Sequence, residues 1–230
     1  MEINKILLGD CMNIMQQIDN ESIDLIITDP PYGDNIVYGR NNKEIKNNEN
    51  PLINCHALME FERILKNNSN VYLFTNWKHY PFLKGYIEEY TSFNIRMLIV
   101  YVKNHFGMGY GFRNQYELIV VLEKGSPDYN LNDFSNIVFA EHINQTENTH
   151  PHQKDWRIIQ KIIKHSSKEN DIILDPFAGS GQICLAAKQL KRNYIGIEIE
   201  EKWHNFSNNK LNQNIITDFL KGGSNEIKNI

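Results

Sequence analysis

The stretch Ile-Ile-Thr-Asp-Pro-Pro-Tyr at residues 26–32 is an apolar run that ends abruptly in an acid, two prolines and an aromatic residue. It extends an apolar segment that begins at Ile23 and is short and continuous, as is typical of a parallel strand covered on both faces. Pro30 and Pro31 end this strand, because proline has no backbone N–H to donate and biases the residue before it towards extended geometry. The sequence therefore predicts a strand over residues 22–28 and a stiff turn at its carboxyl end, the edge at which open α/β sheets bind ligands.

Three groups of different chemistry lie in this turn. Asp29 supplies a carboxylate, Pro30 a carbonyl and Tyr32 an aromatic face. An acid that merely occupies a turn after a strand is the competing interpretation of Asp29, and the Pro-Pro-Tyr that follows argues against it. We therefore expect the chemistry of the protein at residues 29–32.

Length and charge limit the classes of protein to consider. The chain has 230 residues, of which 41% are hydrophobic, and we expect a single domain over residues 1–230 around one core. The net charge of -4 gives no general basic surface, so contact with nucleic acid would rest on local clusters of Lys and Arg. The N-terminus lacks a basic and apolar leader, and no apolar run approaches the length of a membrane span. We therefore predict a cytoplasmic protein without membrane contact.

The placement of cysteine and histidine argues against a metal centre. The three cysteines, Cys11, Cys55 and Cys184, are far apart and form no CxxC pair, which disfavours a disulfide framework and a Cys-based zinc site. The histidines at 142, 150 and 152 have no Cys or carboxylate at metal-ligand spacing. We predict no bound metal.

Strands and helices are expected to alternate along the chain, as the apolar periodicity predicts. This alternation implies right-handed crossovers and therefore a doubly wound, mostly parallel α/β sheet. The connection between residues 94–102 and 116–123 looks too short for a helical crossover, which predicts an antiparallel strand. The expected strands are residues 4–9, 22–28, 70–75, 94–102, 116–123, 171–174 and 194–199, and the expected helices are residues 11–18, 51–65, 80–90, 155–165, 183–190 and 201–220.

Two segments lack such periodicity. Residues 33–50 are rich in Gly, Asn and Lys and predict a mobile loop. Residues 125–149 contain Gly, Pro and many Asn and Asp residues, and we interpret them, including the apolar patch at 137–140, as an irregular connector.

Aromatic and basic residues occur together in two loops. Tyr38 and Arg40 lie in the first loop. They could contact the phosphates and bases of a nucleic acid, and a loop that is merely exposed to solvent is an equally good interpretation. Tyr110 and Arg113 lie between glycines of the other loop, where packing within a hairpin is the rival interpretation.

A second signature lies at residues 171–181, where Asp-Ile-Ile-Leu-Asp-Pro-Phe-Ala-Gly-Ser-Gly reads as a strand that enters a glycine-rich turn and opens a helix. Glycines there let the backbone approach a ligand and leave helix N-terminal amides available to an anionic group. Glu198 ends the next strand about 20 residues further on, where dinucleotide-binding folds place a ribose-binding acid. Cys184 stands where the third small residue of a dinucleotide fingerprint would be, so the pattern favours a nucleoside ligand over a dinucleotide, with a plain helix start as the competing interpretation.

Taken in order, these motifs resemble the S-adenosylmethionine-dependent (SAM-dependent) DNA amino-methyltransferases, in the permuted arrangement in which the catalytic motif precedes the cofactor motif. Asp-Pro-Pro-Tyr at 29–32 is similar to the catalytic signature of that family, and Asp-Pro-Phe-Ala-Gly-Ser-Gly at 175–181 is similar to its SAM-binding motif. The resemblance extends to Gly-Asp-Cys at 9–11, His-Pro-His-Gln-Lys at 150–154 and Arg-Asn-Tyr-Ile-Gly-Ile-Glu at 192–198. It implies a circularly permuted, Rossmann-like methyltransferase fold.

The resemblance implies transfer of a methyl group from SAM to the N6 amine of adenine in DNA, directly and on a base flipped out of the duplex. The leading Asp29 favours adenine within the family, and cytosine N4 is the second candidate. Methylation of an RNA base or a protein amide is a further alternative, although an amide-specific motif begins with Asn. The non-enzymatic alternative is a catalytically inactive SAM- or DNA-binding regulator.

Roles for individual residues follow from the resemblance. Asp10 would reach the adenine end of SAM, with a helix N-cap as an almost equal alternative, and Gln182 stands where the family usually has Thr. The predicted catalytic residues are Asp29, Pro30 and Tyr32; the cofactor-binding residues are Asp10, Lys154, Asp175, Phe177, Gly179, Gly181 and Glu198; and the DNA-binding residues are Pro31, Tyr38, Arg40, Tyr110 and Arg113.

The predicted partner is DNA, with residues 33–50 and 125–149 as candidate contact segments. Both are short for a separate recognition domain. We therefore expect either a short target with loose specificity or a homodimer that shares recognition, and the family leaves room for a cognate restriction endonuclease.

Overall fold

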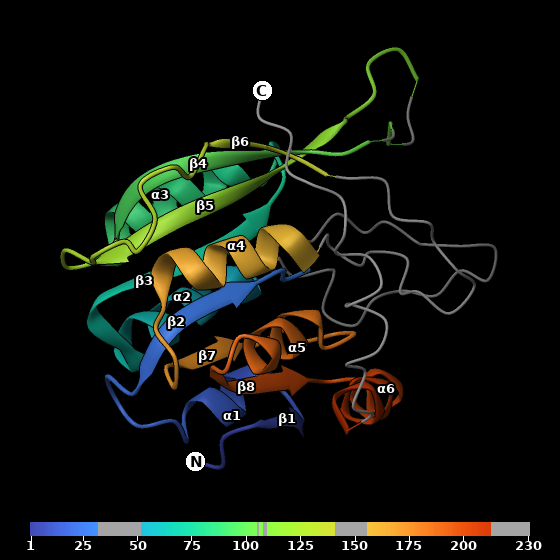
Figure 1. Ribbon diagram of the computed structural model, residues 1–230. Helices are drawn as coiled ribbons and strands as arrows, with labels where there is room; N and C mark the ends of the chain where they lie inside the picture. The colour runs from blue at the N-terminus through green and yellow to red at the C-terminus, as the bar shows by residue number, and fades with distance from the viewer. Residues whose placement is uncertain (32–51, 105, 108–109, 141–155, 213–230) are drawn as a thin grey trace.

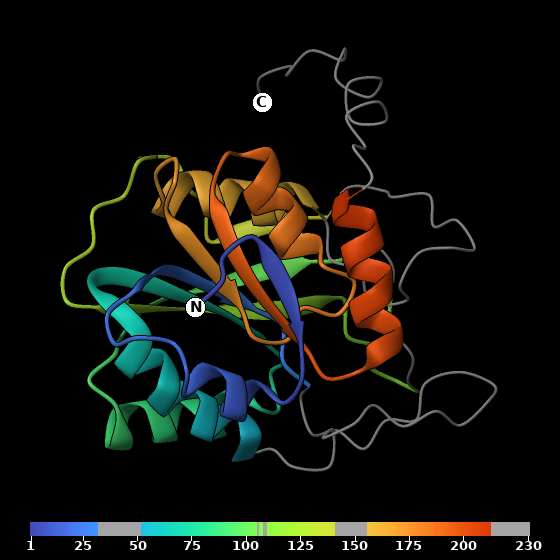
Figure 2. The same ribbon diagram turned by 90° about the horizontal axis from the view of Figure 1, so that it is seen from below.

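The computed structural model describes residues 1–31, 52–104, 106–107, 110–140 and 156–212, without the side chains of residues 52–54. Within these ranges eight strands form one sheet, which helices cover on both faces (Figures 1 and 2). The strands are β1 (Lys5–Leu8), β2 (Ile23–Thr28), β3 (Leu65–Thr75), β4 (Asn94–Val102), β5 (Tyr116–Lys124), β6 (Ile137–Phe139), β7 (Ile172–Asp175) and β8 (Asn193–Glu198). The helices are α1 (Cys11–Met15), α2 (Leu52–Ile64), α3 (Tyr80–Tyr90), α4 (Trp156–Ser166), α5 (Gln182–Gln189) and α6 (Glu201–Asn212).

The strands follow the order β1-β8-β7-β2-β3-β5-β4-β6 across the sheet. β5 runs antiparallel to both of its neighbours, β3 and β4, and the other pairings are parallel. This arrangement confirms the predicted doubly wound, mostly parallel α/β sheet with an antiparallel strand. β1 pairs with β8, so strands from the two ends of the chain are neighbours.

The central strand β2 is buried on both faces, which explains its continuous apolar run. Leu25 and Ile27 pack in a cluster with α4 and α5, whereas Ile26 packs with α1, α2 and α3 on the opposite face. All three side chains are fully buried, and burial of an aliphatic side chain of this size contributes about 1.5–3 kcal/mol. The strand that carries the Asp-Pro-Pro-Tyr turn is therefore firmly held from both sides.

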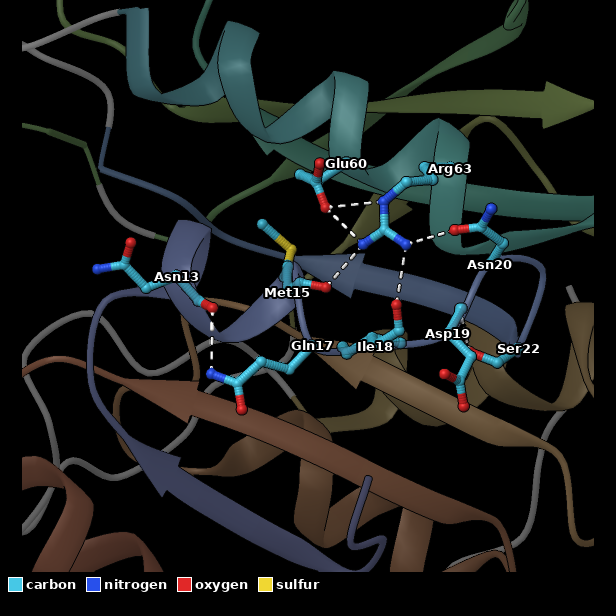
Figure 3. Close-up of polar contacts among 9 residues, drawn as sticks. All are labelled: Asn13, Met15, Gln17, Ile18, Asp19, Asn20, Ser22, Glu60 and Arg63. Carbon is cyan, nitrogen blue, oxygen red and sulfur yellow. Dashed lines mark hydrogen bonds and ion pairs between the residues drawn. The ribbon is translucent and has the colours of Figure 1, made fainter.

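The helix predicted over residues 11–18 is shorter in the structure, where α1 ends at Met15. After Met15 the chain forms a tighter turn, in which Ile18 N donates to Met15 O at 2.9 Å. Arg63 of α2 donates from Nη2 to Met15 O at 2.8 Å and from Nη1 to Ile18 O at 2.9 Å, as Figure 3 shows. A side chain from another helix thus satisfies the carbonyls at the end of α1 and ties that helix to α2.

Part of the predicted irregular connector is a strand. Ile137–Phe139 forms β6 and pairs in parallel with β4, with Ile137 opposite Val100. The prediction of residues 125–149 as wholly irregular was therefore wrong. Three residues are too few to show a periodicity, and they become a strand only because the edge of the sheet offers them a partner.

β3 is also longer than predicted, because it begins at Leu65, which pairs with Ile23 across an irregularity in the register. Its first half is polar and carries no apolar pattern. The mobile loop predicted at 33–50, residues 141–149 of the connector and residues 213–220 of the last predicted helix lie outside the described residues. No helix in the described ranges is long and apolar enough to cross a membrane.

Candidate active site

The two signatures meet at the carboxyl edge of the sheet. β2 and β7 are adjacent and parallel, and Ile26 pairs with Leu174 two residues before Thr28 ends β2. Thr28 Oγ1 donates to Asp175 Oδ1 at 3.1 Å, and both side chains are buried. This hydrogen bond joins the last residue of β2 directly to the last residue of β7, so the tertiary fold places the Asp-Pro-Pro-Tyr turn beside the glycine turn.

The first turn is partly enclosed. Pro30 is buried, and Asp29 and Pro31 are half-buried. The Asp29 carboxylate lies near enough to Asp175 to contribute to the raised pKa of that residue. Tyr32, the third predicted catalytic residue, lies outside the described residues, as do Tyr38, Arg40 and Lys154.

Asp175 organises the second turn. Its Oδ1 accepts hydrogen bonds from Phe177 N at 3.2 Å and from Thr28 Oγ1. Burial raises its pKa from 3.8 to about 8, and the nearby charges of Asp29 and Glu198 add to the shift. The position predicted to bind cofactor is thus a buried carboxyl group that orients the turn through its backbone.

The glycines of this turn meet two different requirements. Gly179 has φ 48° and Gly181 has φ 71°, both in the left-handed region that other residues rarely adopt. A Cβ on Gly181 would lie 2.8 Å from Ser207 Cβ of α6, whereas a Cβ on Gly179 would meet only Phe177 O, at 4.0 Å. Gly181 therefore permits close packing of α6, and Gly179 leaves the backbone of the turn open to a ligand.

Glu198 lies at the tip of β8, next to β7, and is buried. Its Oε2 accepts from Gly179 N at 2.7 Å and its Oε1 accepts from Glu200 N at 2.7 Å. Burial raises the pKa of this carboxyl group above its usual value. The predicted ribose-binding acid is therefore hydrogen-bonded to the glycine turn itself.

Asp10 lies one strand further along the same edge, after β1. Its Oδ1 accepts from Met12 N at 2.9 Å and Asn13 N at 3.2 Å, so it is the N-cap of α1. The capping interpretation is confirmed, and the contact with a cofactor stays a prediction. Gly9 N donates to Glu198 O at 2.9 Å, which holds the start of α1 against the tip of β8.

The connection between β4 and β5 also leaves the sheet at this edge. Tyr110 is fully exposed. Arg113 donates from Nε to Gly107 O at 2.7 Å, and its guanidinium lies 5.5 Å from the centroid of the Phe106 ring. Arg113 therefore packs within its own hairpin, and a DNA contact of either residue stays a prediction.

Two features of the site were not predicted. Thr28 reads as the end of an apolar run, and the only signal of its role is a hydroxyl residue directly before Asp29. Gln182, which stands where the family usually has Thr, accepts from Lys210 Nζ at 2.8 Å through its Oε1. Burial lowers the pKa of Lys210 to about 8.

The residues at this edge fit the nucleoside part of SAM. The Glu198 carboxylate sits at a strand end and each of its oxygens has two lone pairs, so it can accept from ribose hydroxyls while retaining its backbone bonds. The turn at Gly179 is open enough for a ligand to approach the backbone. In the described parts of the chain no group of three or more His, Cys, Asp or Glu residues is placed to hold a metal ion.

Comparison with known proteins agrees with this geometry. The DNA adenine methyltransferase YhdJ of Escherichia coli (strain K12) is 26% identical over 246 residues, which cover 88% of this chain and 80% of the relative. The crystal structure of the M1.HpyAVI–SAM complex superimposes with a TM-score of 0.71 and 25% identity, over 90% of this chain and 98% of the other. The cytosine-N4-specific PvuII DNA methyltransferase has a TM-score of 0.76 over 94% and 91% of the two chains, and at 13% identity this likeness concerns the fold alone.

The family is established by the sequence as a whole. A model of the DNA methylase family of N6 and N4 methyltransferases matches residues 23–209, which span both signatures and the sheet between them. The chain therefore belongs to the DNA methylase family and is a DNA N6/N4 methyltransferase that uses S-adenosylmethionine.

Proposed function

We propose that the chain methylates the N6 amine of adenine in DNA. The observation that carries the proposal is the Thr28–Asp175 hydrogen bond, which holds the Asp29–Pro30 turn beside the cofactor turn. Two features support adenine as the base. The motif begins with Asp, which favours adenine within the family it resembles, and the similar protein YhdJ is described as a DNA adenine methyltransferase.

The proposed chemistry needs an amine with an available lone pair. In adenine this lone pair is delocalised into the ring, so the nitrogen is a poor nucleophile. The Asp29 carboxylate and the Pro30 carbonyl would accept the two N–H groups, which favours a pyramidal nitrogen and directs its lone pair. SAM, when bound, supplies an electrophilic methyl on a sulfonium sulfur. The methyl carbon would bond to the nitrogen as its bond to sulfur breaks, which leaves a neutral thioether. The Asp29 carboxylate, which already accepts an N–H of the amine, would take the proton that the nitrogen releases.

The base must leave the duplex to reach this turn. Unstacking costs a few kcal/mol, and an aromatic partner returns about 1–3 kcal/mol. We propose that Tyr32 provides this partner, with Pro31 shaping the same pocket.

Cytosine N4 is the second candidate, because its amine is delocalised in the same way and the family includes both activities. The test incubates the purified protein with SAM and unmethylated DNA, and then measures modified nucleosides by mass spectrometry after complete digestion. Parallel reactions contain RNA or protein as acceptor. N6-methyladenine in DNA is the expected product, whereas N4-methylcytosine alone would replace the proposal with the alternative.

An inactive regulator is distinguished by Asp29→Ala. We expect this variant to lose methyl transfer and to keep SAM binding, measured by calorimetry. Unchanged cellular effects in the variant would support a regulator instead.

We also propose that recognition is either short and loosely specific or shared by a homodimer. Base-modification sequencing of DNA from an expressing host would report the target sequence. Mass measurement by light scattering, with and without DNA, would separate a monomer from a dimer. A cognate restriction endonuclease would appear as an activity that cleaves unmethylated DNA at the same target sequence and spares the methylated DNA.

A further inference from the structure

The turn after β3 carries an exposed aromatic and basic pair that neither signature explains. Trp77 is 49% exposed, and Lys78 beside it is exposed too, with its Nζ 5.9 Å from the centroid of the Trp77 ring. Exposing so large an aromatic ring to water is unfavourable unless something covers it. No carboxylate in the described residues forms an ion pair with Lys78.

This pair is held rigidly. Asn76 Oδ1 accepts from Lys78 N and His79 N, both at 2.9 Å, and Tyr80 N donates to Asn76 O at 3.0 Å. His79 directly after the pair is buried. The turn therefore presents Trp77 and Lys78 from a fixed backbone at the start of α3, so little backbone entropy would be lost when they contact a ligand.

Strand order places the pair next to the catalytic turn. β3 is parallel to β2, with Thr28 opposite Leu73, so the last residue of β3, Thr75, lies level with Pro30. Both turns leave the sheet at the same edge (Figure 1).

The same order places the pair between two other functional segments. β3 lies between β2 and the β5–β4 pair, so the Trp77 turn lies between the Asp-Pro-Pro-Tyr turn and the loop that joins β4 to β5. A strand of DNA that extends from the catalytic turn towards that loop crosses the end of β3, after which Trp77 and Lys78 lie.

We propose that Trp77 and Lys78 contact DNA beside the target base. Trp77 stacks on a base of the target strand that is unstacked when the target base leaves the duplex, and Lys78 neutralises a flanking phosphate. Base–aromatic stacking needs an exposed, fixed ring, and a phosphate needs an ammonium without a carboxylate partner. The chain has a net charge of -4, so isolated cations at this edge matter more than they would on a basic protein. The proposal rests on the proposed exit of the target base from the duplex, but not on which amine receives the methyl group.

The test measures binding of the intact protein to unmethylated duplex DNA by fluorescence anisotropy, and so succeeds or fails independently of methyl transfer. Trp77→Ala should raise the Kd about 5- to 150-fold, and Trp77→Phe should recover part of the loss. Lys78→Gln should reduce the slope of log Kd against log salt concentration by about 1. SAM binding and the thermal unfolding midpoint should not change.

Two substitutions away from the edge are matched controls. Tyr90 is an exposed aromatic residue at the other end of α3, and Lys168 is an exposed lysine in the connection between α4 and β7. Tyr90→Ala and Lys168→Gln should leave DNA binding unchanged. The proposal is overturned if Trp77→Ala binds DNA within twofold of the wild type and Lys78→Gln keeps the salt slope. It is also overturned if Trp77→Ala instead converts a dimer to a monomer in the absence of DNA, since the ring would then belong to a protein interface.

Discussion

Replacing Asp175 by Asn tests whether a buried, protonated carboxyl group sits under the cofactor turn. Burial raises the pKa of Asp175 from 3.8 to about 8. Asn has the same shape and can still accept from Thr28 Oγ1 and Phe177 N, so the substitution removes the ionisation with little change in packing. The two proteins should therefore differ in how their stability depends on pH.

The sign follows from proton binding. Below pH 3.8 the group is protonated in the folded and unfolded chains, and its contribution to stability is complete. Between about pH 4 and pH 8 the unfolded chain releases this proton while the folded chain retains it, so stability falls as the pH rises. Each pH unit in this window changes the free energy of unfolding by about 1.4 kcal/mol. Between pH 5 and pH 8 the free energy of unfolding of the wild type should therefore fall by about 3–4 kcal/mol relative to that of Asp175→Asn.

The assay is urea unfolding of both proteins at four pH values from 5 to 8, with free energies from linear extrapolation. Burial raises the pKa of Glu198 in both proteins, and this contribution cancels in the difference. Asp19→Asn, at an exposed position, serves as the control for replacing a surface aspartate by asparagine. A constant difference between wild type and Asp175→Asn across this range would show that the carboxyl group is already ionised in the folded chain and would refute the reasoning.

Three further substitutions test tertiary contacts, two at the site and one between α1 and α2, with urea unfolding as the common measurement. Gly181→Ala should lower the free energy of unfolding by about 2 kcal/mol and weaken SAM binding, because a Cβ at φ 71° would lie 2.8 Å from Ser207 Cβ. Arg63→Met should lower the free energy of unfolding by about 2–4 kcal/mol, because it removes the donors to the carbonyls of Met15 and Ile18 (Figure 3). Thr28→Val should lower the free energy of unfolding by about 1–2 kcal/mol and slow methyl transfer, because it removes the hydrogen bond that joins β2 to β7.

Two control variants carry the same type of substitution at positions without these contacts, and they measure the effect of the substitution itself. Gly85→Ala lies in α3 with nothing near its added Cβ and should stabilise the chain by about 0.5–1 kcal/mol. Arg96→Met removes a largely exposed guanidinium 3.6 Å from Glu123 and should cost less than about 1 kcal/mol. Equal losses in Gly181→Ala and Gly85→Ala, or in Arg63→Met and Arg96→Met, would contradict the packing account. If Thr28→Val kept the stability and the activity of the wild type, the role given to the Thr28–Asp175 hydrogen bond would be contradicted.

Local patterns in the sequence were sufficient for most of the architecture. The continuous apolar run before Asp29 predicted a strand covered on both faces, and β2 is buried on both sides because of those side chains. The short connection after residue 102 predicted the antiparallel pair. The two signatures, read together, predicted the family and its cofactor. Each of these features depends on residues that are close together in the sequence, because apolar periodicity and turn-forming residues are local properties.

Only the tertiary structure decided the contacts between distant segments. β6 is a strand because β4 offers an open edge, and the carbonyls of Met15 and Ile18, at and after the end of α1, accept hydrogen bonds from Arg63 of another helix. The hydrogen bond from Thr28 to Asp175 joins residues 147 positions apart, and the place of Trp77 beside the catalytic turn depends on the order of strands in the sheet. The physical reason is that periodicity records which face of an element is buried but not which element covers it. The sequence by itself predicted two ligand-binding turns, and the order of strands in the sheet decided that they lie side by side.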